Sequence, residues 1–458
     1  MSVAASPADV PMRAMAVVFF TALAVRLVNA LTLSGDPAHF FIEDARLYWD
    51  GAAFLLEHGR LDPPPEGAPG RERMPLYFIF LAAVRAVFGD APLAAITVQS
   101  ALDAGTCLLV FKLGAMLGPR VGLLSGAFAA AWPNLIVHSA ALLTETVFLF
   151  LFAAMTLAAA RHVASGRAKH AAAAGVLCGA ALLARSVVQF LPFAMAAAAP
   201  VVAVVARRSI GRSTLAAAAV VTGAAVLASP WLAANWRDHG ALAWTTQEGT
   251  HVSAWVLPLV RQAMDGTPHA EGARLYRDRY LDELRGAGTD PAAMDPFALS
   301  RHLRARGMDD LAAMPISVLA AAWLKGAAIN LAAPAVALDP RLRAARQGSV
   351  YNDPATGLLA RAQGYLATTA PAARPWIVAG LAFSIFSLTL QAWGFLALLR
   401  ERPWIAAAAG ALLIYVLLVT GPIYSPKYRI PAEPVLIVLA ALGAERGLSL
   451  LRRRQAPM

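Results

Sequence analysis

Long apolar runs separated by polar connections dominate the chain. A helix of about 20 apolar residues crosses the hydrocarbon core of a bilayer, so each run is a candidate membrane span. The runs lie at 12–33, 76–89, 92–114, 120–137, 141–160, 170–184, 187–206, 213–234, 313–333, 376–399, 404–420 and 431–451. This pattern predicts an all-α, polytopic membrane protein.

Basic residues in the short connections indicate how these runs are oriented, because cytoplasmic loops of membrane proteins are enriched in Lys and Arg. The basic short segments are 112–120, 161–169, 207–212, 400–402 and the tail 446–454. If all of them lie in the cytoplasm with Arg13, an even number of spans separates each from the next. Three runs lead from Arg13 to Lys112, and three more lead from Arg212 to Arg400. One run in each set therefore cannot cross the membrane.

The weakest run in each set is expected to stay at the membrane surface. Run 76–89 contains Arg85, and run 313–333 contains Lys325 and Asn330 between flanking prolines. We expect the first to be a juxtamembrane helix on the outer side and the second to be interfacial or re-entrant. About ten transmembrane helices remain, with both termini inside, and the segment 170–206 crosses twice.

This layout divides the chain into three parts. Residues 1–235 form an N-terminal transmembrane module that includes a first outer loop at 34–91. Residues 236–375 form one large outer loop region with interfacial helices, and residues 376–458 form the C-terminal transmembrane helices and a basic cytoplasmic tail. The large loop is rich in Arg, but long loops are translocated largely regardless of their charge.

Composition excludes the other broad classes of protein. Of 458 residues, 59% are hydrophobic and 15% are charged, whereas a soluble domain carries roughly 25% charged residues. The net charge of +11 comes largely from the ends of apolar runs, so it indicates orientation and not a nucleic-acid partner. Cys107 and Cys178 both lie inside apolar stretches, which argues against a structural disulfide. The N-terminal run continues without a cleavage motif, so we interpret it as a retained span.

Polar residues that are scattered along the sequence fall on the outer side in this layout. They are Glu43, Asp44, Arg46, Tyr48, Glu72, Arg73, His138, Glu145, Arg185, Lys427, Tyr428 and Arg429. Ionisable side chains at membrane depth are costly and usually line a functional cavity. The sequence therefore predicts a polar cavity at the outer face of the membrane.

The acidic residues of this set also have purely structural interpretations. Glu145 and Arg185 each interrupt an apolar stretch, and they would equally suit a buried ion pair that holds helices together. Glu43 and Asp44 precede a helical pattern, so they would equally suit a solvated N-cap that interacts with the helix dipole. Spacing alone leaves both pairs of interpretations open.

The basic residues have structural alternatives as well. A lone interfacial histidine such as His138 is more often a packing or headgroup residue than a ligand-binding one. Lys427 and Arg429 next to a span are often headgroup anchors, but they lie on the face opposite to the basic bias. Arg26, in the outer half of the first span, would either snorkel to the interface or contact a charged lipid ligand.

Carboxylates and cations at one membrane face suit a reaction on an anionic, lipid-linked substrate. Guanidinium or ammonium groups would bind a phosphate and stabilise its charge as it departs. A hydroxyl acceptor needs a carboxylate as its general base. Since no Gly-rich phosphate-binding loop followed by Lys-Ser or Lys-Thr is present, a lipid-carried donor is favoured over a cytosolic nucleotide sugar.

Five motifs together resemble those of a known group of enzymes. They are Glu43-Asp44-Ala-x-x-Tyr48, Arg-x-Arg73-Met-Pro-Leu-Tyr, Trp-Pro with His138 and Leu-Thr-Glu145-Thr, Leu-Leu-Ala-Arg185, and Lys427-Tyr428-Arg429-Ile-Pro. Their order and common sidedness resemble the membrane glycosyltransferases of the GT-C fold. The chain is similar to the bacterial branch related to protein O-mannosyltransferases and the lipid A aminoarabinose transferase. The likeness covers most of residues 12–235 and 376–450.

The resemblance implies a reaction and roles for particular residues. A sugar would move from a polyprenyl-phosphate carrier to an acceptor outside the bacterial cytoplasmic membrane, usually with inversion. Asp44 matches the catalytic base because it directly precedes Ala-x-x-Tyr, and Glu43 would help to position the substrate, although the family order is commonly Asp-Glu. By position, the candidates for contact with the donor phosphate are Arg73, Arg185, Lys427 and Arg429. Arg46, Tyr48, Glu72, His138, Glu145 and Tyr428 complete the expected substrate site.

Cofactor and acceptor do not follow from the resemblance. Some GT-C enzymes need a divalent metal, Mg²⁺ or Mn²⁺, and others do not, and no ligand cluster in the sequence decides between them. The acceptor would be a lipid, a glycan or a protein. Residues 236–375 match no motif of the family.

Two other functions compete with a glycosyltransferase. A transporter or lipid flippase would also hold charges in a membrane cavity, but such folds often show paired repeats with broken helices at mid-depth, and the sequence shows no such repeat. A lipid-linked polysaccharide polymerase or ligase would rely on Arg and His of the large outer loop, without the Glu43–Asp44 pair. A structural scaffold is the remaining alternative.

Overall fold

The computed structural model describes residues 12–61, 71–205, 207–347, 351 and 357–455, and these are almost entirely helical. Within them, the β structure is a single isolated bridge between Arg346 and Thr369. The first half contains α1 (Met12–Leu33), α2 (Ala45–His58), α3 (Leu76–Phe88), α4 (Pro92–Ala115), α5 (Pro119–Ala131), α6 (Pro133–Ser139), α7 (Glu145–Ser165), α8 (Ala168–Ala184), α9 (Leu191–Ala197), α10 (Ala199–Val205) and α11 (Ile210–His239). The all-α prediction is confirmed.

The second half begins with shorter helices. They are α12 (Gln247–His251), α13 (Leu257–Asp265), α14 (His269–Gly286), α15 (Pro296–Ala312), α16 (Ile316–Ala332), α17 (Pro340–Ala344) and α18 (Leu358–Ala367). Three longer elements follow: α19 (Arg374–Glu401), α20 (Pro403–Thr420) and α21 (Glu433–Gln455), with the 3-10 helix η8 (Pro426–Ala432) before α21. The shorter helices of the predicted outer loop region therefore separate the two sets of long apolar helices.

Seven of the described helices are long and apolar enough to cross a membrane, and the number rises to ten if each of three bent helix pairs is one span. The bent pairs are α5 with α6 at 47°, the 3-10 helix η2 (Ser186–Val188) and α9 with α10 at 45°, and α15 with α16 at 112°. The prediction of about ten spans matches the upper count. The predicted spans and the observed helices differ at two segments. Helix α8, predicted to be a span, has 17 residues and is too short to be included in the ten. Helix α16, predicted to stay at the surface, is included as part of a bent pair.

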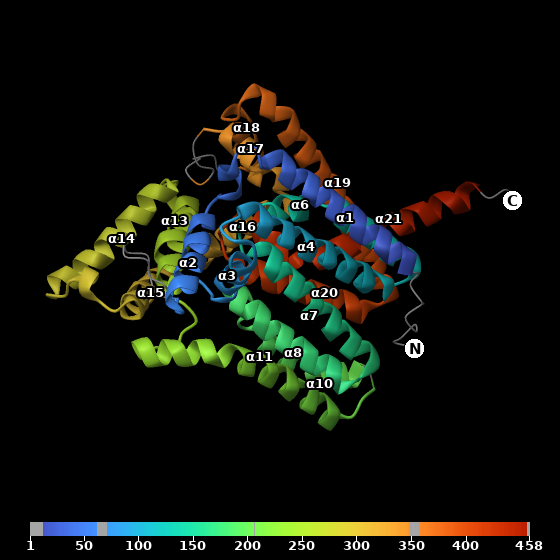
Figure 1. Cartoon of the computed structure of the whole chain (residues 1–458), viewed down its shortest axis with the longest axis horizontal. Coiled ribbons are helices and arrows are strands. Elements are labelled where there is room, and N and C mark those ends of the chain that lie inside the picture. The colour runs from blue at the N-terminus through green and yellow to red at the C-terminus, as the bar shows by residue number, and fades with distance from the viewer. Residues whose placement is uncertain (1–11, 62–70, 206, 348–350, 352–356, 456–458) are drawn as a thin grey trace.

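Helix α8 is held by close backbone contacts because its interface consists of small residues. It packs between α7 and α11 (Figure 1). A Cβ atom added at Gly179 would lie 2.8 Å from the carbonyl oxygen of Ala224 in α11, so only a glycine allows this approach. Small residues at helix interfaces are typical of membrane proteins, where close packing replaces hydrophobic collapse.

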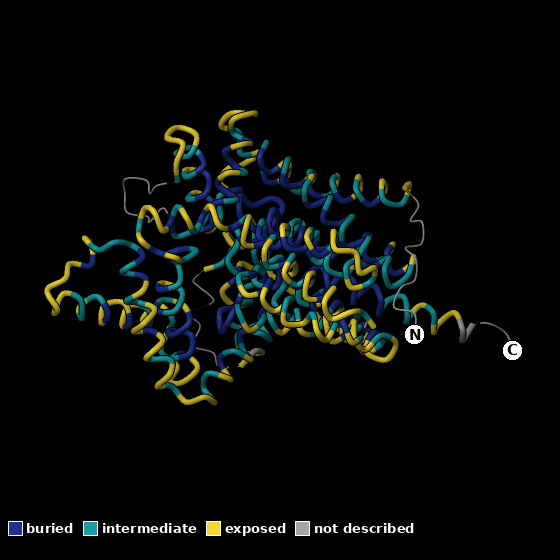
Figure 2. Tube along the Cα trace, turned by 90° about the horizontal axis from the view of Figure 1, so that it is seen from below, coloured by how far each residue is buried: buried dark blue, intermediate teal, exposed yellow. Residues whose placement is uncertain are grey.

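The core of the bundle lies where α4, α5, α7 and α21 meet. Its large buried side chains include Phe111, Trp132, Phe148, Phe152 and Ile437. Residues 429–443 are buried without interruption, so η8 and the first half of α21 pass through the interior (Figure 2). By contrast, apolar side chains such as Phe20, Leu31 and Leu418 are more than half exposed on the outer helices. An exterior of this kind suits a lipid environment.

The helices of residues 236–375 gather away from the chain ends. In Figure 1 the start of α1 and the end of α21 lie at one end of the molecule, and α13, α14 and α15 lie at the opposite end. Helix α3 has 13 residues, about 20 Å of helix, which is too short to span the bilayer. This arrangement agrees with an even number of crossings between the two chain ends.

Candidate functional site

The loop between α1 and α2 carries the first acidic residue of the site. Glu43 has a side chain that is 21% exposed, and its carboxylate accepts hydrogen bonds from Lys427 Nζ at 2.6 Å and Arg343 Nη1 at 3.1 Å. The loop is fixed to the turn before α7, because Leu142 N–H donates to the Phe40 carbonyl at 3.1 Å. Glu43 therefore joins three parts of the chain that are distant in sequence.

The backbone of Glu43 is in a conformation that L-residues rarely adopt. Its φ is +51°, and among the described non-glycine residues only Arg207 shares a positive φ. A residue held in the left-handed region costs about 1–3 kcal/mol, which the surrounding contacts must offset. The ion pairs with Lys427 and Arg343 are among the contacts that Glu43 makes in this conformation.

Burial alone would raise the pKa of the Glu43 carboxyl, but Lys427 and then Arg343 outweigh that effect. The pKa of Glu43 is therefore held below its ordinary value of 4.5. Glu43 is ionised at neutral pH and binds protons weakly.

Asp44 occupies the N-cap position of α2 but does not cap the helix with its side chain. Its side chain is 43% exposed, and its carboxylate lies 3.2 Å from Arg73 Nη2. Asp44 is thus the N-cap residue of α2 by position, as the structural alternative has it, but its carboxylate makes no capping hydrogen bond. Arg73 Nη1 is ion-paired with Glu72 Oε1 at 3.2 Å.

Tyr48 lies one turn along α2, on the buried side of the same loop. Its ring packs edge to face on Tyr77 of α3, with centroids 5.1 Å apart. Burial raises the pKa of the Tyr48 phenol above its ordinary value of 10, so the hydroxyl stays protonated. Arg46 points elsewhere: its guanidinium stacks over the Phe41 ring at 4.2 Å. Tyr48 has Asp44 and Arg73 among its electrostatic neighbours, whereas Arg46 contacts the Phe41 ring.

Glu145 and Arg185 form an ion pair between the start of α7 and the end of α8. Glu145 is 3% exposed, and Arg185 is 22% exposed and also donates to Thr144 Oγ1 at 3.0 Å. Lys427 is an electrostatic neighbour of Glu145, and the phenol groups of Tyr48 and Tyr428 are neighbours of Arg185. The pair therefore borders the cluster around Glu43.

His138 lies on α6 with a fixed tautomer. Its Nδ1 is 2.7 Å from the Asn134 carbonyl, and a carbonyl only accepts, so Nδ1 carries the proton and Nε2 is the acceptor. Its charged neighbours are Glu145, Glu43 and Lys427. His138 is thus brought to the same centre.

Arg429 lies apart from the first-loop carboxylates. Its Nε donates to Glu433 at 2.9 Å, and its Nη1 donates to the Leu331 carbonyl at 2.5 Å at the end of α16. Glu433 is fully buried and also accepts from Trp132 and Asn134. Arg429 therefore ties η8 to α16 with most of its donors, whereas Lys427 two residues earlier contacts Glu43.

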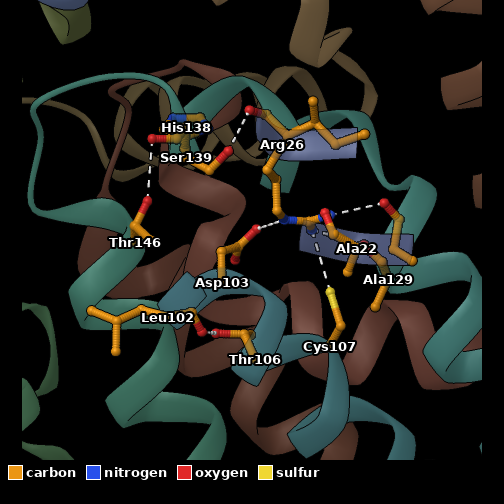
Figure 3. Close-up of polar contacts among 12 residues, drawn as sticks. Ala22, Arg26, Leu102, Asp103, Thr106, Cys107, Ala129, His138, Ser139 and Thr146 are labelled. Carbon is orange, nitrogen blue, oxygen red and sulfur yellow. Dashed lines mark hydrogen bonds and ion pairs between the residues drawn. The ribbon is translucent and has the colours of Figure 1, made fainter. Parts of the chain in front are cut away.

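Arg26 does not reach the surface of the protein, so the expectation that it snorkels to the interface is wrong. It is fully buried, and its Nε lies 2.5 Å from Asp103 of α4 (Figure 3). Asp103 lies in the middle of an apolar run, and that isolated acid was the signal that could have revealed the pair.

Sequence reasoning also missed Arg343. This residue lies on α17, in the region that matched no motif, and it reaches the Glu43 carboxylate. Its neighbour Arg341 donates to Asn29 at 3.0 Å and to Thr32 at 3.1 Å on α1, which fixes α17 over the first loop. The Pro-Arg-Leu-Arg sequence after Asp339 is a helix start with a capping Asp, but nothing in it indicates the partner.

The carboxylates of the site do not form a metal-binding group. Within the described residues, no three His, Cys, Asp or Glu side chains gather as a metal ion would require. Glu43, Asp44, Glu72 and Glu145 are each paired with Arg or Lys instead. This donor set suits an anionic ligand held by the cations better than a divalent cation.

A known protein family matches the part of the chain that contains several of these site residues. Residues 69–233 match the dolichyl-phosphate-mannose-protein mannosyltransferase family. This mannosyltransferase-family segment runs from the end of the first outer loop into α11 and contains Arg73, His138, Glu145 and Arg185. The family resemblance inferred from the sequence is confirmed there.

Two solved structures are similar to the whole chain. One is the crystal structure of ArnT from Cupriavidus metallidurans in the apo state, with 15% identity and a TM-score of 0.43, covering 94% of this chain and 76% of that one. The other is the crystal structure of ArnT from the same organism bound to undecaprenyl phosphate, with 15% identity and a TM-score of 0.44, covering 94% and 77%. No curated protein matches the chain in sequence.

Proposed function

We propose that the chain is an integral membrane glycosyltransferase that moves a sugar from a polyprenyl-phosphate carrier to an acceptor hydroxyl. The reaction takes place at the periplasmic face of the bacterial inner membrane, and the acceptor is a lipid, a glycan or a protein. The family match over residues 69–233 supports the class of reaction. The arrangement of charges around Asp44 and Glu43 supports the donor and the mechanism.

The observation that carries the proposal is the difference between two adjacent carboxylates. The Asp44 side chain is 43% exposed and has one cation beside it, Arg73 at 3.2 Å. Glu43 is held by Lys427 and Arg343 together. Asp44 is therefore open to substrate, while Glu43 holds Lys427 and Arg343 in place. Sugar transfer to a hydroxyl can use the first carboxylate as a base and the cations beside the second as phosphate ligands.

Asp44 is the general base in this mechanism. It removes the proton from the acceptor hydroxyl as the acceptor oxygen bonds to the anomeric carbon of the donor sugar. The bond between that carbon and the phosphate oxygen breaks, and the polyprenyl phosphate leaves with the electron pair. A single displacement of this kind inverts the configuration at the anomeric carbon.

The cations stabilise the departing phosphate, since guanidinium and ammonium groups make strong charge-assisted hydrogen bonds to phosphate oxygens. Arg73, Arg343 and Lys427 surround the two carboxylates and are the first candidates. Arg185 lies at the edge of this cluster of cations, and its ion pair with Glu145 would hold it near the same phosphate.

Three neutral side chains and the Glu72 carboxylate complete the substrate site. His138 presents Nε2 as an acceptor, and Tyr48, Tyr428 and Glu72 are proposed to bind sugar hydroxyls beside it. The proposal gives Arg46 and Arg429 no contact with the donor, because Arg46 stacks on Phe41 and Arg429 is bound to Glu433 and α16.

The test is transfer by the purified protein. It is reconstituted with a panel of polyprenyl-phosphate sugars and an envelope extract as the acceptor source, with Mg²⁺, with Mn²⁺ and with a chelator, so that the metal requirement is measured in the same assay. We expect the wild type to consume a lipid-linked sugar and Asp44→Asn to lose at least about a hundredfold in rate. Asp50→Asn, on the exposed side of α2, is the matched control and should keep its rate.

Two results would contradict the proposal. A wild type that consumes none of the lipid-linked sugars in any metal condition would reject the reaction itself. Full activity of both Asp44→Asn and Glu43→Gln would reject the carboxylate mechanism even if transfer occurred. Release of polyprenyl phosphate, followed by chromatography, distinguishes transfer from simple transport of the lipid.

A further inference from the structure

Arg26 makes an unusually complete set of contacts inside the bundle. Besides the Asp103 carboxylate at 2.5 Å, its guanidinium donates to the carbonyls of Ala130 at 2.9 Å, Ala129 at 3.1 Å and Ala22 at 3.1 Å. It also contacts Cys107 Sγ at 3.3 Å (Figure 3). One side chain from α1 thus binds α4 and the end of α5 at once.

The carbonyls of α5 need this donor because the span is broken. Helix α5 ends at Ala131, α6 begins at Pro133, and their axes differ by 47°. Proline has no N–H, so the carbonyl of Ala129, four residues earlier, loses its helical donor and keeps only a 3.3 Å bond from Trp132 N–H. Unsatisfied carbonyls are costly at membrane depth. The Arg26 guanidinium satisfies them.

Helix α6 connects this break to the candidate site. Asn134 donates to Glu433 at 2.6 Å and to the Pro426 carbonyl at 3.1 Å, and its own carbonyl binds His138 Nδ1. Thr146, at the start of α7, donates to the His138 carbonyl at 3.1 Å. The direction of α6 therefore decides where the His138 ring lies relative to Glu43 and Glu145.

Stability alone does not account for the buried pair of charges. Arg26 is fully buried, and Asp103 is 1% exposed. Apolar residues of similar volume commonly replace such pairs at no cost, because burying two charges offsets much of their attraction. A pair of apolar residues would hold α1 against α4, but it could not donate to the α5 carbonyls.

We propose that Arg26 and Asp103 are positioning residues for the site. Asp103 neutralises and aims the Arg26 guanidinium, Arg26 completes the end of α5, and the bent span thereby holds α6 so that His138 faces the carboxylate centre. This inference rests on the proposed function for its catalytic consequence, but the positioning itself is measurable without a reaction.

The first experiment removes both charges together. Arg26→Met with Asp103→Leu leaves no unpaired charge, so the protein should still fold. We expect amide hydrogen exchange to rise at least tenfold over residues 129–142 and to stay unchanged in α7 and α8. The matched control replaces the exposed pair between Arg446 and Glu401, 2.6 Å apart, with glutamines and should change neither segment. Unchanged exchange over residues 129–142 in the charge-free variant would overturn the proposal.

The second experiment couples the pair to His138. We expect the charge-free variant to lose at least tenfold in kcat with the donor KM within about threefold, and His138→Ala to add less than twofold in that background although it costs much more in the wild type. Equal effects of His138→Ala in both backgrounds would overturn the proposal. If the charge-free variant does not accumulate, Arg26→Lys, which keeps the charge but loses the forked donors, is measured by the same criteria. Failure of the proposed function is distinguishable, because the wild type would then transfer no sugar.

Discussion

The Glu43 carboxylate accepts a hydrogen bond from Lys427 at 2.6 Å across 384 positions of sequence. The second cation on the same carboxylate, Arg343, is 300 positions away. The first outer loop, the large loop region and the C-terminal helices thus each contribute one charge to a single contact. The site exists only when all three parts of the chain have assembled.

The stability that Glu43 contributes should depend on pH in one direction. Because its pKa is lower in the folded protein than its ordinary value of 4.5, this stability is complete above that value and is lost as pH falls through the folded-state pKa. The difference in Tm between wild type and Glu43→Gln should be constant between about pH 6 and pH 8 and should shrink below about pH 4.5. Thermal denaturation in detergent checks this. A difference that grows as the pH falls would contradict the pairing with Lys427.

Removing one partner of the Glu145–Arg185 pair should destabilise the protein strongly. Glu145→Gln leaves the Arg185 guanidinium without its carboxylate, which costs about 3–5 kcal/mol when a charge is buried. The double variant Glu145→Gln with Arg185→Gln should recover most of this stability, as denaturation in detergent would show, while its transfer rate stays low. Recovery of the rate together with the stability would mean that the pair only holds helices together.

Arg343→Ala should weaken the binding of donor more than it weakens folding. Arg343 is 39% exposed and reaches Glu43 from α17, so its loss removes a phosphate-binding cation and leaves Glu43 paired with Lys427. We expect the donor KM to rise about tenfold, equivalent to one charge-assisted hydrogen bond. Arg301→Ala, at an exposed position on α15, is the matched control. An equal change in both variants would show a general effect of charge on lipid binding.

The contact between α19 and α21 should not tolerate a methyl group at Gly443. A Cβ atom there would overlap the Leu390 carbonyl oxygen, and the Gly394 nitrogen lies only 3.1 Å away. Because both obstacles are backbone atoms, Gly443→Ala should cost about 1–3 kcal/mol by denaturation. Gly447→Ala, one turn later in α21, meets no atom of the described residues within 4 Å and should be neutral or stabilising by up to about 1 kcal/mol. Similar values for both would contradict the packing.

The bends and short helices show where sequence patterns stop being sufficient. Run 170–184 is as apolar as a span but forms the 17-residue helix α8, which packs on α11 through glycines. Run 313–333 becomes α16, bent 112° from α15. An apolar sequence is expected both for a helix that faces lipid and for a helix that is buried in protein. The length of the helix and the helices that pack against it decide between the two environments.

The sequence by itself determined the helical class, the orientation signal and the residues of the first outer loop, because apolar length, basic loops and local motifs are properties of short segments. It also indicated Glu145 and Arg185, since a charge inside an apolar run is visible without a structure. Only the tertiary structure decided which charges pair. Glu43 with Lys427 and Arg343, and Arg26 with Asp103, depend on how helices pack, and the relative placement of distant helices follows from no local period.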